Sequence, residues 1–478
     1  MIVPGHTTQV DFHSSGLTIL KRELLEGAFR LQTADFSENF LKNLPFDLFV
    51  KNQIISEINL SKNQIHSVPP RLFLGLNQLK SIDLSHNQIT TLNKLLFKDA
   101  NSVTHLDLSN NRLLSITRVT LMNMINLQSL DLSSNRFRDL SPLKFDGKQL
   151  ESIKLDHNNL DKLSMTMFKY LDNVKTFSAR GNRLEAIPSF ISNKLPSAIA
   201  MDFGEAQNKI SEIKEDQFKN ATRLKRLFME DNAIKDIPES AFGECETLVF
   251  LDFRRNRFKR VKNDWIKKCA NLTHVFFGQN DIQEVPKALF NPHENLRTFD
   301  LSNNRIKKLP VEFAEENQDL AHIFLQNNLI KRLPTHLFYG SERLKSIDLA
   351  NNRLLTVGNV LPRDLNIRPD HVNLINLSRN KNVGEELNKR WAGYDSWHYK
   401  SGAVLHPVED PMTAFENALK ESSHHLRSLN PTGGLVERFG FTPFEDDQEE
   451  AGALGLRRAL DNLSGTSFGS SALPENEL

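Results

Sequence analysis

Residues 55–68, ISEINLSKNQIHSV, contain the frame that decides the fold. The segment is apolar at its positions 1, 4, 6, 11 and 14, and Asn63 occupies position 9. An apolar frame that repeats with a period of about 20–29 residues is typical of a solenoid, in which each turn stacks on the one before it. Here the frame returns at a step of 24 residues or close to it, which places asparagines at Asn39, Asn63, Asn87, Asn111, Asn135, Asn158, Asn182, Asn208, Asn232, Asn256, Asn280, Asn304, Asn328 and Asn352.

The frame also predicts the local structure of each turn. Positions 3–8 alternate between apolar and polar residues, which indicates a short strand, and stacked strands form one parallel sheet. The sharp bend after the strand leaves interior backbone groups that cost about 1–3 kcal/mol each when unpaired. A buried asparagine offers both a donor and an acceptor to such groups. We therefore interpret the asparagine ladder as structural, notably at Asn63, Asn87, Asn111, Asn135, Asn232, Asn256, Asn280, Asn304, Asn328 and Asn352.

A second periodic feature is aromatic. A phenylalanine recurs 18 positions after position 1 of many turns, often within the pattern LPxxxF. We expect these rings to stack behind the sheet as a second spine, formed by Phe49, Phe73, Phe97, Phe145, Phe168, Phe242, Phe290 and Phe338.

Two segments, LKSIDLSHNQITTL at 79–92 and LRTFDLSNNRIKKLP at 296–310, closely resemble the 24-residue typical class of leucine-rich repeats. This class includes Toll-like receptor ectodomains and related secreted or cell-surface proteins. The resemblance extends from about residue 10 to about residue 383. It implies an α/β repeat fold, namely a right-handed leucine-rich-repeat solenoid with a concave parallel β-sheet and a mostly irregular convex side.

We expect two regions. Residues 1–383 form the solenoid, in about 15 turns, and residues 384–478 form an acidic, largely disordered tail with short helical segments. The overall charge of +1 conceals a split, because the tail has 8 Lys and Arg against 16 Asp and Glu. The repeat region therefore carries a net charge of about +9, and an acidic tail of this kind is most often solubilising.

Two features of the sequence point to different cellular locations. We find no run of about 18 apolar residues and no signal peptide at the start, which predicts no membrane span and leaves a cytoplasmic location open. The family class instead favours an extracellular or cell-surface location. Half a repeat begins almost at the first residue without a polar cap, so we expect a fragment with a missing N-terminal cap, whose first turn exposes Leu17, Leu20 and Phe36.

The two cysteines, Cys245 and Cys269, lie 24 residues apart at the same slot of adjacent turns. Other turns fill this slot with Leu76, Ala100 or Met124, so we favour two stacked core thiols. The alternative is a disulfide, because strands about 4.8 Å apart bring the two Cα atoms within bridging range. Two cysteines offer too few ligands for a structural metal site.

No catalytic motif stands out, whether GxSxG, P-loop, HExxH, GxGxxG or CxxC. We accordingly predict a protein that is not an enzyme, with no catalytic residue, no metal site and no cofactor. What remains is the open face of the sheet, where positions 3, 5, 7 and 8 of each turn are free of core constraint.

This open face changes character along the chain. Position 5 holds Asp83, Asp107 and Asp131 in early turns, whereas later turns alternate phenylalanine with aspartate. Exposed aromatic and arginine side chains form binding hot spots, so we expect a ligand there, although the rings could instead pack on one another. The predicted concave-face ligand residues are Arg226, Phe228, Phe250, Asp252, Arg254, Arg255, His274, Phe276, Asp300, His322 and Phe324.

A basic stretch, FRRNRFKRVKNDWIKK, occupies residues 253–268. Such a charge run is most often a solvated flank of the structure. The alternative is a binding site for an anionic glycan at residues 254–268. The near-neutral net charge of the whole chain argues against nucleic acid as a ligand. The sequence therefore predicts a non-enzymatic recognition protein that binds a protein ligand through the concave face of the solenoid, like a receptor ectodomain. An intracellular leucine-rich-repeat scaffold or adaptor is the alternative.

Overall fold

The protein is described here from a computed structural model. The structure describes residues 2–356, with short gaps at 146–148, 288, 291–292, 312, 314–316, 335–336, 338–340 and 342, together with residues 374–377 and 379–380. The predicted tail from residue 384 and its boundary lie outside the described residues.

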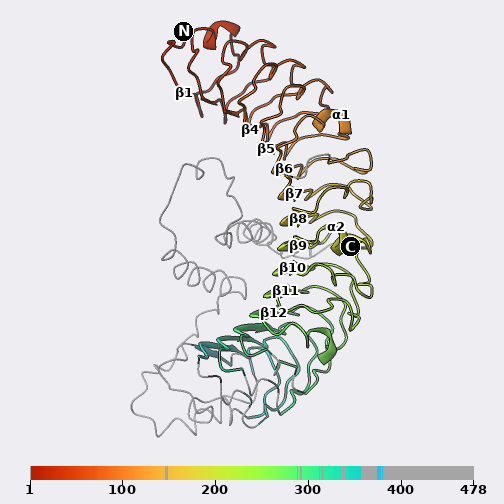
Figure 1. The fold of residues 1–478 in the computed structure, drawn as a ribbon. Helices are drawn as coiled ribbons and strands as arrows, with labels where there is room; N and C mark the ends of the chain where they lie inside the picture. Colours follow the sequence, from red (N-terminus) through yellow and green to blue (C-terminus); the bar gives the residue numbers. More distant parts are fainter. Residues whose placement is uncertain are drawn as a thin grey trace, which may run out of the picture. The chain divides into compact units, whose positions relative to one another are not determined.

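Sixteen three-residue strands form one parallel sheet, in which every strand pairs only with its neighbours in sequence. Paired residues are mostly 24 apart, as in Ile58 and Ile82. The strands line the inner side of the solenoid (Figure 1), which confirms the predicted concave sheet. They are β1 (Gln9–Asp11), β2 (Thr33–Asp35), β3 (Glu57–Asn59), β4 (Ser81–Asp83), β5 (His105–Asp107), β6 (Ser129–Asp131), β7 (Ser152–Lys154), β8 (Thr176–Ser178), β9 (Ala200–Asp202), β10 (Arg226–Phe228), β11 (Phe250–Asp252), β12 (His274–Phe276), β13 (Thr298–Asp300), β14 (His322–Phe324), β15 (Ser346–Asp348) and β16 (Leu374–Asn376).

The outer side of the solenoid consists mainly of turns, as predicted. Its helical pieces among the described residues are single turns: η1 (Arg22–Leu25), α1 (Arg118–Leu121), α2 (Ile191–Lys194) and η2 (Asn263–Trp265). None of these described helices approaches the length or apolar content of a bilayer span.

Between the sheet and the outer turns lies one continuous core, built from the apolar positions of the frame. The predicted phenylalanine spine is buried at its described positions, and its rings stack, as in Phe73 and Phe97 at 6.0 Å between centroids. The first turn is also covered: Leu20 is 4% exposed and Phe36 is fully buried, with Phe12 stacked on Phe36 at 5.5 Å. The expectation that Leu20 and Phe36 are exposed is therefore wrong.

The asparagine ladder is buried, and its hydrogen bonds confirm the predicted role. Asn256 shows the pattern: its Nδ2 donates to the carbonyl oxygens of Met229 at 2.9 Å, Phe253 at 3.1 Å and Arg254 at 3.2 Å. Its Oδ1 accepts the backbone N–H of Ile234 at 3.0 Å. Each asparagine thus fastens its own bend to the preceding turn.

Position 8, directly before each asparagine, has a left-handed backbone that the frame did not reveal. Arg255 has a φ of 53° and Asp231 a φ of 57°, and the same conformation recurs from Ser14 to Asn351. Such a φ costs a residue with a side chain of order 1 kcal/mol. The bend is sharp enough to require it, and the ladder bonds next to it offset the cost.

Cys245 and Cys269 form a disulfide, with their Cα atoms 4.6 Å apart. The favoured prediction of two core thiols is therefore wrong, and the alternative holds. The parallel stacking of consecutive turns is the reason, because it places equivalent slots within bridging range.

Candidate functional site

Aspartates at position 5 of the concave face have a structural role. Each accepts a hydrogen bond from the backbone N–H two residues later, at 2.7–3.0 Å, and so closes the end of its strand. Asn59 does the same for Ser61 at 3.0 Å. The aspartates that form this bond are Asp11, Asp35, Asp83, Asp107, Asp131, Asp202, Asp252, Asp300 and Asp348.

The phenylalanines expected to face solvent are largely buried. Phe250 is 3% exposed and Phe276 and Phe324 are fully buried, which contradicts the expected exposure; Phe228 is half-buried. Phe250 lies between its neighbours, 4.9 Å from the Phe228 ring and 5.3 Å from that of Phe276. The strands therefore bring Phe228, Phe250 and Phe276 together as one aromatic cluster, which is the packing that the sequence analysis left as the alternative.

Two histidines occupy position 3 of the turns of β12 and β14, and His274 contacts the aromatic cluster. His274 is buried, with its ring 6.2 Å from that of Phe250, and burial lowers its pKa to about 3, so it is neutral at physiological pH. His322 is half-buried and bonds the Ser346 hydroxyl through Nδ1 at 2.9 Å.

The predicted arginines differ from one another. Arg254 is buried and donates from Nε and Nη2 to the Asp252 carboxylate, at 3.0 Å and 2.6 Å, while its guanidinium lies 5.1 Å from the centre of the Phe276 ring. The expectation of an exposed Arg254 and Asp252 is therefore wrong. Arg255 is partly exposed and pairs with Asp231 at 2.6 Å, and Arg226 is half-buried at the start of β10.

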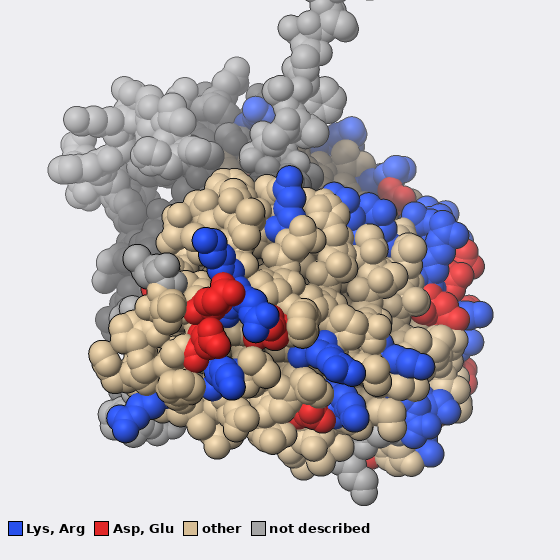
Figure 2. Space-filling view, turned by 90° about the horizontal axis from the view of Figure 1, so that it is seen from above, with Lys and Arg blue, Asp and Glu red and all other residues tan. Residues whose placement is uncertain are grey.

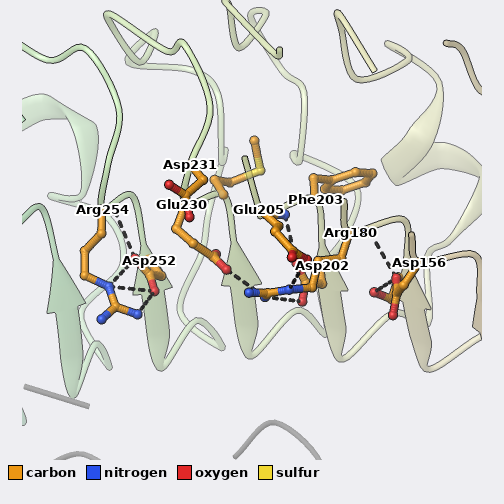
Figure 3. A network of polar contacts seen from close by, with 12 residues as sticks. Asp156, Arg180, Asp202, Phe203, Glu205, Glu230, Asp231, Asp252 and Arg254 are labelled. Carbon is orange, nitrogen blue, oxygen red and sulfur yellow. Dashed lines mark hydrogen bonds and ion pairs between the residues drawn. The ribbon is translucent and has the colours of Figure 1, made fainter. Parts of the chain in front are cut away.

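An ion network that the sequence did not reveal lies beside these residues (Figure 3). Arg180 pairs with three carboxylates from the next two turns: Asp202 at 3.3 Å, Glu205 at 3.1 Å and Glu230 at 2.6 Å. Glu205 belongs to the irregular turn in which the asparagine step stretches to 26 residues. Glu205 is at position 8 of its turn, and the two extra residues follow it, before Asn208.

Glu230 depends on a glycine of the preceding turn. Its carboxyl group lies over Gly204, where an added Cβ would approach it to 2.4 Å. Burial raises the pKa of Glu230 to about 7; Arg180 opposes this shift, and Asp202 and Asp252 add to it. Gly278 has the same relation to Asp300, whose pKa burial raises to about 6.

The concave positions of the frame are rich in carboxylates. Positions 3, 5, 7 and 8 of the turns of β1 to β15 hold 15 carboxylates and 6 Lys or Arg. Lys and Arg are instead common on the outer surface, as the view onto the first turns shows (Figure 2). The carboxylates of this acidic strip are Asp11, Asp35, Glu38, Glu57, Asp83, Asp107, Asp131, Asp156, Asp202, Glu205, Glu230, Asp231, Asp252, Asp300 and Asp348.

The basic stretch at 254–268 is not one surface. Arg254 and Arg255 pair on the concave face, whereas Lys262 pairs with Asp236 at 2.6 Å and Lys268 with Glu244 at 2.6 Å on the outer side. Asp236 also accepts a hydrogen bond from the Trp265 indole at 3.1 Å. Four of the cations in the stretch are thus already neutralised, which weakens the expectation of an anionic site along it.

Sequence reasoning also missed an apolar group on the outer side. Val50, Leu74 and Met122 occupy the same frame position in different turns and are 55%, 45% and 45% exposed. Ile125, beside Met122, is 55% exposed. Position 20 is not one of the inward positions of the frame. A comparison of the residues at this position between turns could therefore have found the apolar group.

Comparisons with known proteins agree with this architecture. The leucine-rich-repeat family profile matches residues 29–89, 55–113, 79–137, 101–160, 125–184 and 294–354. No curated protein sequence matches the chain. A leucine-rich-repeat protein of Leptospira interrogans has a similar structure, with a TM-score of 0.64 and 21% identity over 77% of this chain and 93% of that one.

Two similar structures come from receptor complexes. A chain of the Drosophila Toll–Spatzle complex gives a TM-score of 0.62 at 17% identity, over 76% of this chain and 53% of that one. The plant peptide hormone receptor RGFR1 in complex with RGF2 gives a TM-score of 0.62 at 24% identity, over 76% of this chain and 57% of that one. Because the same asparagine slot is filled in turn after turn, and the family profile overlaps those turns, the chain is a leucine-rich-repeat protein of the 24-residue typical class.

Proposed function

We propose that this protein is a non-enzymatic recognition protein that binds a protein ligand through the concave face of its solenoid. The observation that carries the proposal is the acidic strip: 11 of its 15 carboxylates and 4 of its 6 cations are at least partly exposed, and burial keeps Asp107 protonated up to about pH 8. A row of like charges on a rigid sheet repels itself and favours a partner of opposite charge. The expected ligand therefore presents Lys and Arg side chains to the strip.

The accessible part of the predicted site is smaller than the sequence indicated. Arg226, Phe228, Arg255 and His322 retain partial exposure, whereas Phe250, Asp252 and Phe276 are buried beneath or between them. Aromatic and arginine side chains at the edge of a packed cluster are the usual anchors of an interface. We assign direct contact to these partly exposed residues, and support from below to the buried ones.

Two further observations support the proposal. The similar structures include the Toll–Spatzle complex and the receptor RGFR1 in complex with RGF2, so proteins of similar fold are found bound to a partner. The disulfide between Cys245 and Cys269 favours an oxidising compartment, and hence an extracellular protein over an intracellular scaffold.

Site-specific photo-crosslinking tests the proposed face. A photoreactive residue at Phe228, on the concave side, and another at Leu74, in the exposed apolar group, are compared against a fraction of extracellular proteins. We expect a protein crosslink through position 228 that added salt weakens, because exposed charges are screened over about 10 Å at 0.1 M salt. Crosslinks through position 74 alone would place the site on the outer side and overturn the proposal.

A further inference from the structure

Three pairs of cations lie along one edge of the solenoid. They occupy positions 12 and 13 of the turns of β11, β13 and β14, and their side chains are all exposed. We name this set the basic edge: Lys259, Arg260, Lys307, Lys308, Lys331 and Arg332.

Backbone hydrogen bonds show that the turns of the basic edge are stacked neighbours. The N–H of Asp281 donates to Phe258 at 2.9 Å, that of Arg305 to Ile282 at 2.8 Å, and that of Leu329 to Ile306 at 2.9 Å. Neighbouring strands lie about 4.8 Å apart, so the pairs extend over roughly 14 Å. The edge is thus a short, rigid row of charge on a regular scaffold.

The cations of the basic edge differ from those in the rest of the 254–268 stretch. Within the described part of the chain, no ion pair joins any of the six to a carboxylate, whereas Lys262 and Lys268 each have one. Carboxylates reach this side in the intervening turn, at Asp281 and Glu284, and Asp281 already pairs with Arg305 at 2.9 Å. Like charges about 5 Å apart in water repel by roughly 1 kcal/mol per pair. Glu284 occupies the same frame position as Arg260 in the intervening turn and forms an isolated β-bridge with it, so it offsets part of this repulsion.

We propose that the basic edge binds a linear sulfated polysaccharide. A chain with regularly spaced anionic groups can bridge three cation pairs on a rigid row, and it neutralises their mutual repulsion. The disulfide favours a compartment in which such polysaccharides, rather than nucleic acids, are the abundant polyanions. No aromatic side chain is interleaved with the six cations, so the edge lacks the stacking platform of single-stranded nucleic-acid sites.

Heparin serves as the probe, with the full chain and two variants of equal charge change. The edge variant carries Lys307→Gln, Lys308→Gln, Lys331→Gln and Arg332→Gln. The control variant carries Lys42→Gln, Lys51→Gln, Lys94→Gln and Lys98→Gln, at exposed positions of the second and fourth turns. Thermal melts establish that both variants fold, and the concave face is unchanged in both.

We expect the wild type and the control to bind size-defined heparin fragments with equal affinity, and the edge variant to bind about tenfold more weakly or worse. Four lost exposed ion pairs at roughly 0.2–1 kcal/mol each support that figure. The edge variant should also show a weaker dependence of affinity on salt. An equal loss of heparin affinity in both variants would mean that the interaction is unspecific attraction between charges. Tighter binding to duplex nucleic acid than to heparin would assign the basic edge to another polymer. Either result overturns the proposal.

Discussion

At the scale of single residues, the fold rests on polar side chains that satisfy the bend after each strand. The ladder asparagine forms up to four hydrogen bonds, and the position 5 aspartate closes the strand end. The left-handed residue between them is strained, so these bonds hold a conformation that the chain would not adopt alone.

Asn256→Ala is expected to lower the free energy of unfolding by about 1–3 kcal/mol, because alanine leaves buried carbonyl and N–H groups unpaired. Arg255→Ala is the matched control next to it. This change removes a partly exposed ion pair with Asp231 and should cost about 1 kcal/mol or less. Denaturant midpoints measure both, and equal losses would contradict the assigned role of the ladder.

Asp107 gives the concave face a distinctive pH dependence. Burial raises its pKa from 3.8 to about 8, and the charges of Asp131 and Asp83 add to the shift. The folded state therefore holds this proton to a higher pH than the unfolded state does, and stability falls as the pH rises toward 8. The buried His274 and His293 have lowered pKa values, so their effect is to raise the stability of the folded state as the pH rises. This effect is complete by about pH 6.5, the pKa of histidine in the unfolded chain.

Asp107→Asn should remove this loss. The amide oxygen can still accept the Ser109 N–H, as Asn59 does for Ser61. Because Asp107 keeps partial exposure, we expect the unfolding free energy of the variant to exceed that of the wild type by only about 1 kcal/mol at pH 8. Chemical denaturation between pH 6.5 and 8.5 tests this, with Asp11→Asn as the control in an exposed turn; parallel curves for wild type and Asp107→Asn would refute it.

At the scale of elements, neighbouring turns interlock through side chains that cross from one strand to the next. Arg180 after β8 joins carboxylates of β9 and β10, and Glu230 rests on Gly204. The disulfide does the same covalently on the outer side. The Glu230 contact with Gly204 crosses the step in which the repeat length is 26 residues, whereas the disulfide joins two turns of the regular length.

Gly204→Ala is expected to destabilise the protein by about 1–3 kcal/mol, because the new methyl group would lie 2.4 Å from the buried Glu230 carboxyl. The same substitution in a Glu230→Ala background should cost less, since the colliding atoms are absent. A double-mutant cycle from thermal or denaturant unfolding measures this coupling. Additive losses would show that the close approach is not the cause.

At the scale of the whole solenoid, stability is distributed along a line. Every strand pairs only with its neighbours in sequence, so each turn senses its surroundings through two interfaces. A defect in one turn should therefore weaken nearby turns and leave distant ones intact.

Hydrogen exchange can follow this locality. Asn256→Ala should increase exchange in the turns of β9 to β12 while the amides of β2 to β4 keep their protection. Asn63→Ala is the mirror control and should give the opposite pattern. A uniform increase along the chain from either variant would mean that the solenoid unfolds as one unit.

The sequence by itself determined the period, the parallel sheet, the aromatic spine and the ladder, because all of these follow from inward positions that every turn must fill alike. Outward positions obey no such rule, and their surroundings come from the adjacent turns. Only the tertiary structure decided that Phe250 and Phe276 pack together, that Arg254 pairs with Asp252, and that the two cysteines are bridged. It likewise placed Lys259, Arg260, Lys307, Lys308, Lys331 and Arg332 along one edge, since residues 24 and 48 apart in sequence come to lie one and two turns apart only once the turns are stacked.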